Sequence, residues 1–140
     1  MEILITAIKF ALAIALIACP ILLVNKLFKQ NLKYPFSTYL LFIAVLTFVL
    51  VIVIAWWSDY SSQLLLSNYG YDLEALNDLE RFKNVEIENL DRVKELDKSR
   101  MGIGWPLKAL IFYPFYFPYL LIVYVANHFY KNIKQKLTKL

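Results

Sequence analysis

Side chains that perform covalent or acid–base chemistry are few and scattered in this sequence. There is one cysteine, Cys19, and one histidine, His128, and they form a nucleophile–base pair only if the fold brings them into contact. A single cysteine forms neither an intramolecular disulfide nor a thiolate metal cluster. HExxH, GxSxG, P-loop and GxGxxG motifs are all absent from the sequence. We therefore predict a protein that is not an enzyme and that has no catalytic residue, metal site or cofactor.

Polar side chains within apolar runs are the more specific signal. Lys9 lies in the first run, and Tyr113, Tyr116 and Tyr124 share one helical face in the third. An intramembrane charge marks a functional site by default, although Lys9 is near enough to the helix start to snorkel to the interface. Tyrosine hydroxyls need acceptors in hydrocarbon. These four residues are our candidate face for a lipid-like ligand or a partner helix, with snorkelling and plain aromatic packing as the alternatives.

Two prolines four residues apart, Pro114 and Pro118, interrupt the third run. Each lacks a backbone N–H and leaves a carbonyl one turn earlier without its usual partner. We therefore predict a kink at these residues.

Small residues recur every four positions in the first run, at Ala7, Ala11, Ala15 and Cys19. Such a ridge lets two helices approach closely in a membrane, so we predict a helix-packing face, used within the chain or with a second protein. The tetrapeptide ending at Cys19 also resembles a lipoprotein-processing box. The apolar run continues through Pro20 to Val24, which favours an uncleaved helix.

The elements that must position these residues are three apolar runs, at residues 3–25, 38–57 and 105–128. Each has about the 20 residues that a helix needs to cross ~30 Å of hydrocarbon. The chain is 60% hydrophobic, above the ~45–50% typical of soluble domains. Trp56, Trp57 and Trp105 lie at run ends, where indoles anchor helices at the membrane interface. We predict an all-α integral membrane protein with three transmembrane helices, forming a single unit over residues 1–140.

Basic residues cluster in two short segments an even number of crossings apart. The loop 26–37 contains Lys26, Lys29 and Lys33, and the tail 129–140 contains four lysines and no acid. Positive residues favour the cytoplasmic side. This predicts a cytoplasmic C-terminus, an external N-terminus and an external segment 58–104.

The segment 58–104 has helical periodicity. One apolar stripe runs from Leu73 to Phe82 and another from Ile87 to Leu96, with acids at the start of the second and bases at its end. We predict two short amphipathic helices that form a hairpin outside the membrane. We predict that these helices serve as a packing device, with a binding site as the alternative.

The net charge of +4 does not indicate a nucleic-acid partner, because the segment 58–104 is net acidic and lysines outnumber arginines. Without catalytic groups, our leading hypothesis is a non-catalytic accessory or assembly subunit with a protein partner in the bilayer. The alternatives are a binding or transport protein for a lipid-like small molecule, using the tyrosine-rich third run, and an immunity-type protein that acts through the external segment. Abundant lysine and isoleucine in a short chain favour a bacterial inner membrane.

Overall fold

Every element in the described part of the chain is helical. The computed structural model describes residues 1–30 and 34–137, with side chains as far as Ile133. The elements are α1 (Glu2–Leu27), α2 (Pro35–Asn68), α3 (Asp78–Arg81), the 3₁₀ turn η1 (Ile87–Asn89), α4 (Leu90–Arg100) and α5 (Trp105–Leu137). Three of them, α1, α2 and α5, are long and apolar enough to cross a membrane. The predicted all-α class with three candidate spans is confirmed.

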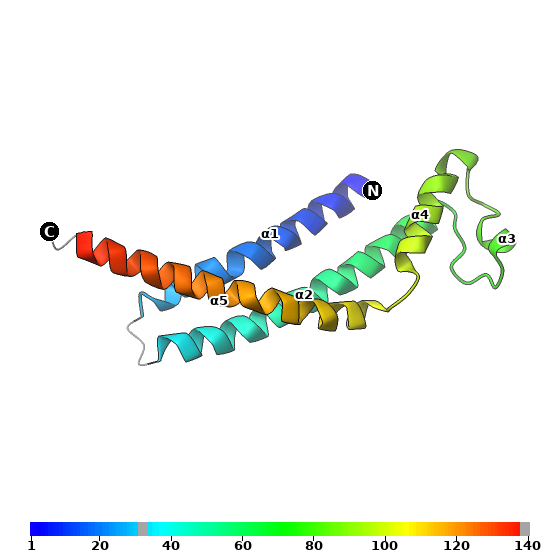
Figure 1. Ribbon diagram of the computed structural model, residues 1–140. Coiled ribbons are helices and arrows are strands. Elements are labelled where there is room, and N and C mark those ends of the chain that lie inside the picture. Colours follow the sequence, from blue (N-terminus) through cyan, green and yellow to red (C-terminus); the bar gives the residue numbers. More distant parts are fainter. Residues whose placement is uncertain (31–33, 138–140) are drawn as a thin grey trace.

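The three long helices lie side by side, and each contacts the other two (Figure 1). One end of the bundle, here called the α4 end, holds the N-terminus, α3 and α4. The opposite end, here called the loop end, holds the passage from α1 to α2 and the second half of α5. Toward the α4 end, α1 and α5 run apart in Figure 1. The bundle is therefore closed at one end and open at the other.

Aromatic side chains close the loop end. The Tyr124 ring lies 5.5 Å from the Phe28 ring, 5.0 Å from Phe36 and 5.2 Å from Tyr39, measured between centroids. Lys131 donates to the Phe28 carbonyl at 2.7 Å. Rings of α2, α5 and Phe28, the residue that follows α1, thus pack together. This matters because apolar side chains gain little from leaving lipid and the helices must associate by packing.

Two tyrosines of α5 bind carbonyls beside a proline in α1. Pro20 has no N–H to donate to the Leu16 carbonyl, and the Tyr116 hydroxyl donates to that carbonyl at 2.6 Å. The Tyr119 hydroxyl donates to the next carbonyl, that of Ile17, at 2.8 Å. A backbone acceptor without a partner is costly in hydrocarbon. The α5 tyrosines therefore compensate for a proline about 100 residues earlier in the chain.

Two further tyrosine hydroxyls join α2 to α5. Tyr39 on α2 donates to the Leu120 carbonyl at 3.1 Å, and Tyr113 on α5 donates to the Ala44 carbonyl at 2.7 Å. Tyr39 is fully buried. Four tyrosine hydroxyls are thus hydrogen-bonded across helices, those of Tyr39, Tyr113, Tyr116 and Tyr119.

At the α4 end, α2 extends to Asn68 and packs against α4. Leu65 and Leu66 of α2 form a small core with Val93 and Leu96 of α4. The chain leaves α2 through Gly70 at φ 81°, where an added Cβ would lie 2.5 Å from the Asn84 carbonyl oxygen. Glycine is needed there for both the backbone angle and the close approach.

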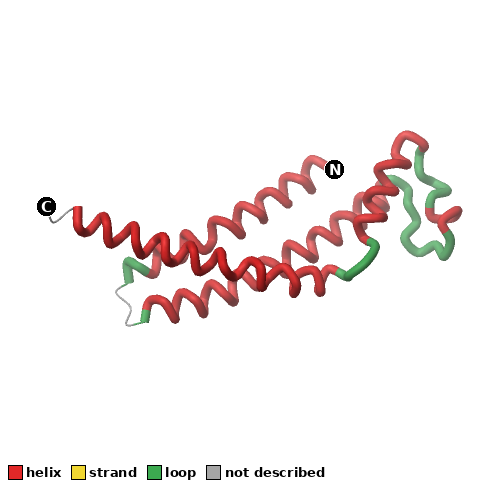
Figure 2. The backbone as a smooth tube through the Cα atoms, in the orientation of Figure 1, coloured by secondary structure: helices red, strands yellow, loops and turns green. Residues whose placement is uncertain are grey.

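The predicted hairpin of two amphipathic helices is not confirmed. Its second arm is present as η1 and α4, whereas residues 71–86 are mostly loop around the single turn α3 (Figure 2). The Asp72 side chain accepts from the Glu74 amide at 2.9 Å, and the Asn77 side chain accepts from the Glu80 amide at 2.8 Å. Such local side-chain bonds give the backbone an alternative to a continuous helix.

Candidate functional site

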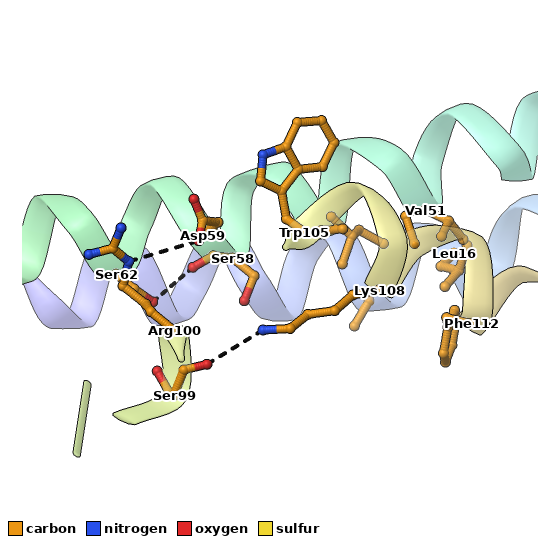
Figure 3. Close-up of a pocket in the computed structure, with 14 residues that line it drawn as sticks. Leu16, Val51, Ser58, Asp59, Ser62, Ser99, Arg100, Trp105, Lys108 and Phe112 are labelled. Carbon is orange, nitrogen blue, oxygen red and sulfur yellow. Dashed lines mark hydrogen bonds and ion pairs between the residues drawn. The ribbon is translucent and has the colours of Figure 1, made fainter. Parts of the chain in front are cut away.

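A cavity lies at the α4 end, between the three long helices and the end of α4. Its volume is about 540 Å³, within the ~300–1,000 Å³ typical of small-molecule sites. Residues of α1, α2, α4 and α5 line it. Figure 3 shows that the α5 and α4 side chains reach it from one side and those of α1 and α2 from the other.

One part of the cavity is apolar and owes its space to small residues. Each of the three long helices contributes an alanine, namely Ala13, Ala55 and Ala109, where a larger side chain would fill the gap. The rest of this wall consists of Leu16, Val51, Ile54 and Phe112. Such a wall suits an aliphatic chain and offers no side-chain hydrogen bond.

The other part of the cavity is polar and contains an arginine with little compensation. Arg100 Nε lies 3.9 Å from Asp59 Oδ1, which is an ion pair but too long for a hydrogen bond. The same nitrogen is shielded from solvent and has no hydrogen-bond partner among the described residues. Asp59 Oδ2 already accepts from the Gln63 amide at 2.7 Å. The Arg100 guanidinium therefore retains donor capacity at the cavity.

Lys108 is the second cation at this polar part. Its Nζ lies 3.5 Å from the Ser99 carbonyl, at the limit of a hydrogen bond, and the side chain is exposed (Figure 3). The nearby serine hydroxyls are used within their own helices, because Ser62 donates to the Ser58 carbonyl and Ser99 to the Leu96 carbonyl. Arg100 and Lys108 thus contribute two cationic donors to the site.

The N-terminal part of α4 is tied to the start of α1. Arg92 Nε donates to Glu2 Oε1 at 3.1 Å, and its Nη1 donates to Glu95 at 2.8 Å. These hydrogen bonds, first to Glu95 and then to Glu2, raise the Arg92 pKa. A hydrogen bond to Glu2 raises the Tyr69 pKa. This contact connects the first and fourth helices and helps to hold α4, with Arg100 at its end, over the bundle.

The candidate ligand face predicted from sequence is not assembled as one site. Tyr113 and Tyr116 donate to carbonyls of α2 and α1 respectively, and Tyr124 belongs to the aromatic cluster at the loop end. Lys9 is exposed and lies one turn before Ala13, so it occupies the same face of α1 as the cavity but does not line it.

The small-residue ridge of α1 does not form the buried face of that helix. Ala7 and Ala11 are exposed, and Ala15 and Cys19 are half-buried. The side chains that α1 buries are Ile5, Leu16, Pro20 and Val24. A four-residue repeat advances about 40° per step around a helix, so the ridge turns from the far side at Ala7 toward the flank of the packed face at Cys19.

The remaining predicted residues are placed as follows. Pro114 and Pro118 are exposed on α5, which continues through both as one helix; the predicted kink stays a prediction. Trp105 lines the cavity. On α2, Trp56 is exposed and Trp57 is half-buried, and the role of the three tryptophans as interface anchors stays a prediction.

Cysteine and histidine are not brought together. His128 packs on Phe28 at 6.1 Å between ring centroids. Phe28 is nine residues beyond Cys19 in the chain, about 13 Å of helical rise. Within residues 1–30 and 34–133, no group of three or more His, Cys, Asp or Glu side chains is arranged to hold a metal ion.

The sequence interpretation missed the residues that line the polar part of the cavity. The sequence interpretation assigns Arg100 only to the basic end of the second apolar stripe, and it assigns no role to Asp59. Lys108 offered a signal, since it is a cation one turn inside the third apolar run. The alanines offered a second signal. However, single alanines on three helices indicate a cavity only once the packing of these helices against one another is known.

No family model, curated protein or solved structure matches this chain, so comparisons with known proteins assign no family to it.

Proposed function

We propose that this chain is a non-catalytic membrane protein that binds a lipid-like molecule in the cavity at the α4 end. The observation that carries the proposal is the two-part cavity, with an apolar wall between three candidate spans and a cationic part beside α4. An amphiphile has the same division between chain and headgroup. This moves the ligand-binding hypothesis away from Tyr113 and Tyr116, whose hydroxyls are used in packing.

The orientation follows from the charges. Lys26, Lys29 and Lys131 all lie at the loop end, since Lys131 contacts the end of α1; Lys33 is outside the described residues. Positive residues favour the cytoplasm, so we infer an external α4 end in a bacterial inner membrane. Labelling of Glu74→Cys, in a Cys19→Ser background, by a membrane-impermeant thiol reagent on intact cells tests this; protection until lysis contradicts it.

A cavity-filling variant tests lipid binding directly. Ala13→Phe places a ring in the cavity, and its matched control is Ala11→Phe, because both alanines are exposed and only Ala13 lines the cavity. The full chain in mild detergent is titrated with an equimolar mixture of phosphatidylglycerol and phosphatidylcholine, and bound lipid is counted by native mass spectrometry. We expect Ala13→Phe alone to lose the bound lipid. Equal retention by both variants contradicts the proposal.

An accessory or assembly subunit is the second candidate, and two exposed surfaces favour it. Ala7 and Ala11 present small residues away from the packed face of α1. Outside the candidate spans, Leu76, Leu79 and Ile87 are 95%, 88% and 91% exposed, and exposed apolar patches mark contact surfaces. Together these surfaces would contact a protein partner both within and above the membrane.

Co-purification tests this second role. The tagged chain is isolated from its native membrane and stoichiometric partners are identified. We expect Ala11→Phe, or the triple change of Leu76, Leu79 and Ile87 to serine, to release such a partner, whereas Ala13→Phe retains it. A monodisperse chain without a partner rules out the accessory role, and a captured toxin turns it into the immunity-type role.

A further inference from the structure

The cationic part of the cavity selects among lipid headgroups. We infer that the cavity binds a membrane phospholipid whose headgroup carries one net negative charge, with Arg100 and Lys108 contacting its phosphate. The inference rests on the proposed lipid-binding function and adds the chemical class of the ligand.

Arg100 provides the first contact. Its Nε is shielded from solvent and lacks a hydrogen-bond partner among the described residues, and Asp59 stands 3.9 Å away. A buried donor without an acceptor is costly, and a guanidinium binds phosphate oxygens in a fixed fork geometry. A phosphate oxygen at this position accepts the hydrogen bond from Arg100 Nε that Asp59 is too distant to accept.

Lys108 provides the second contact and fixes the depth of the headgroup. Its ammonium is bound only weakly to the Ser99 carbonyl and is free to turn to a phosphate. Phe112, one turn further along α5, already belongs to the apolar wall. The polar and apolar parts of the cavity are therefore separated by about 6 Å of helical rise along α5. A headgroup bound at Lys108 places its acyl chain beside Phe112, toward the middle of the bundle.

Charge balance favours a monoanion. The polar part of the cavity carries two positive side chains, Arg100 and Lys108, and one negative side chain, Asp59, which leaves one net positive charge. A phosphodiester with an uncharged headgroup neutralises it. A zwitterionic lipid adds its own cation to the same space, where like charges repel at short range.

The test compares two lipids on the same protein. The delipidated full chain in mild detergent is titrated with phosphatidylglycerol or phosphatidylcholine of identical acyl chains, and dissociation constants are measured by native mass spectrometry. We expect phosphatidylglycerol to bind about tenfold more tightly, because the net positive charge of the cavity repels the choline cation of phosphatidylcholine. Lys108→Gln should remove most of that preference, since it removes this net charge, and Arg100→Gln should act likewise.

Lys94→Gln is the matched control, because Lys94 is an exposed cation on α4 that does not line the cavity. Lys108 is exposed as well, so its replacement leaves folding intact even if Arg100→Gln loosens α4. An equal effect of Lys94→Gln and Lys108→Gln overturns the inference, because it assigns the preference to general surface charge.

The outcomes separate the two proposals. Equal affinity for both lipids, lost in Ala13→Phe, overturns the headgroup inference and leaves the lipid-binding function intact. Binding of neither lipid overturns both. Inorganic phosphate at millimolar concentration should not displace phosphatidylglycerol, since the apolar wall contributes to lipid binding. Displacement by phosphate overturns the lipid assignment in favour of a free anion.

Discussion

The two ends of this bundle are built from different side chains, and they pack differently. At the loop end, aromatic rings of α2, α5 and Phe28, the residue after α1, pack around Tyr124. At the α4 end, α1 and α5 run apart in Figure 1, and alanines from the three long helices line a cavity of about 540 Å³. In a membrane, close helix association depends on shape and hydrogen bonds and not on leaving water. The size of the side chains between the helices thus determines where the three helices pack closely.

The largest expected difference between the ends is in stability. Tyr39 is 0% exposed, whereas Phe112 at the cavity is 51% exposed. Replacing the buried ring should cost about 3 kcal/mol, because Tyr39→Ala leaves a void in the aromatic cluster. Phe112→Ala should cost less than about 1 kcal/mol, since it only enlarges an existing space. Unfolding by SDS in mixed micelles measures both, with Tyr39→Phe as the control for the hydroxyl alone.

Equal costs for the two substitutions would mean that the loop end is no better packed than the α4 end. The comparison between the two ends would then fail.

An intermediate effect is expected at the Leu16 carbonyl, which lacks its usual partner because Pro20 has no N–H. Tyr116→Phe should cost about 1 kcal/mol, as interhelical hydrogen bonds in membranes do. In a Pro20→Ala background the alanine N–H can donate to the Leu16 carbonyl, so the cost of Tyr116→Phe should shrink. A double-mutant cycle measures this coupling.

Tyr113→Phe is the matched control for that cycle. Its acceptor, the Ala44 carbonyl, lies one turn before Phe48, which retains its own N–H. Its cost should therefore be independent of Pro20. Coupling of the same size at both tyrosines would show that the proline is not the reason for the Tyr116 contact.

The smallest effect is a pH dependence confined to the α4 end. Burial, followed by a hydrogen bond to Asp97, raises the pKa of Tyr71 from its usual 10.0. Above pH 10 the unfolded tyrosine loses its proton while the folded one keeps it, so the unfolded state binds fewer protons and stability falls as pH rises. Hydrogen exchange of the α4 amides should accelerate above that pH, and Tyr71→Phe should abolish the increment. Acceleration that is equal at the loop end and unaffected by Tyr71→Phe contradicts this local origin.

Local sequence patterns predicted three helices that could cross a membrane, because length and apolarity alone decide whether a helix can span a bilayer. The prediction of two amphipathic arms in residues 58–104 was only partly matched by the structure. The Leu73–Phe82 stripe has helical spacing, but the Asp72 and Asn77 side chains bind nearby amides and leave only one turn of helix. Periodicity records which residues can share a face, and local hydrogen bonds decide whether the helix forms.

The sequence by itself determined three long apolar helices, the separation of basic from acidic segments and the scarcity of catalytic side chains. Only the tertiary structure decided which face of α1 packs, which carbonyl each tyrosine binds, and that Asp59, Arg100 and Lys108 meet beside three alanines. These pairings join residues dozens of positions apart. They depend on the register and rotation of one helix against another, which packing across the whole bundle sets and no local pattern records.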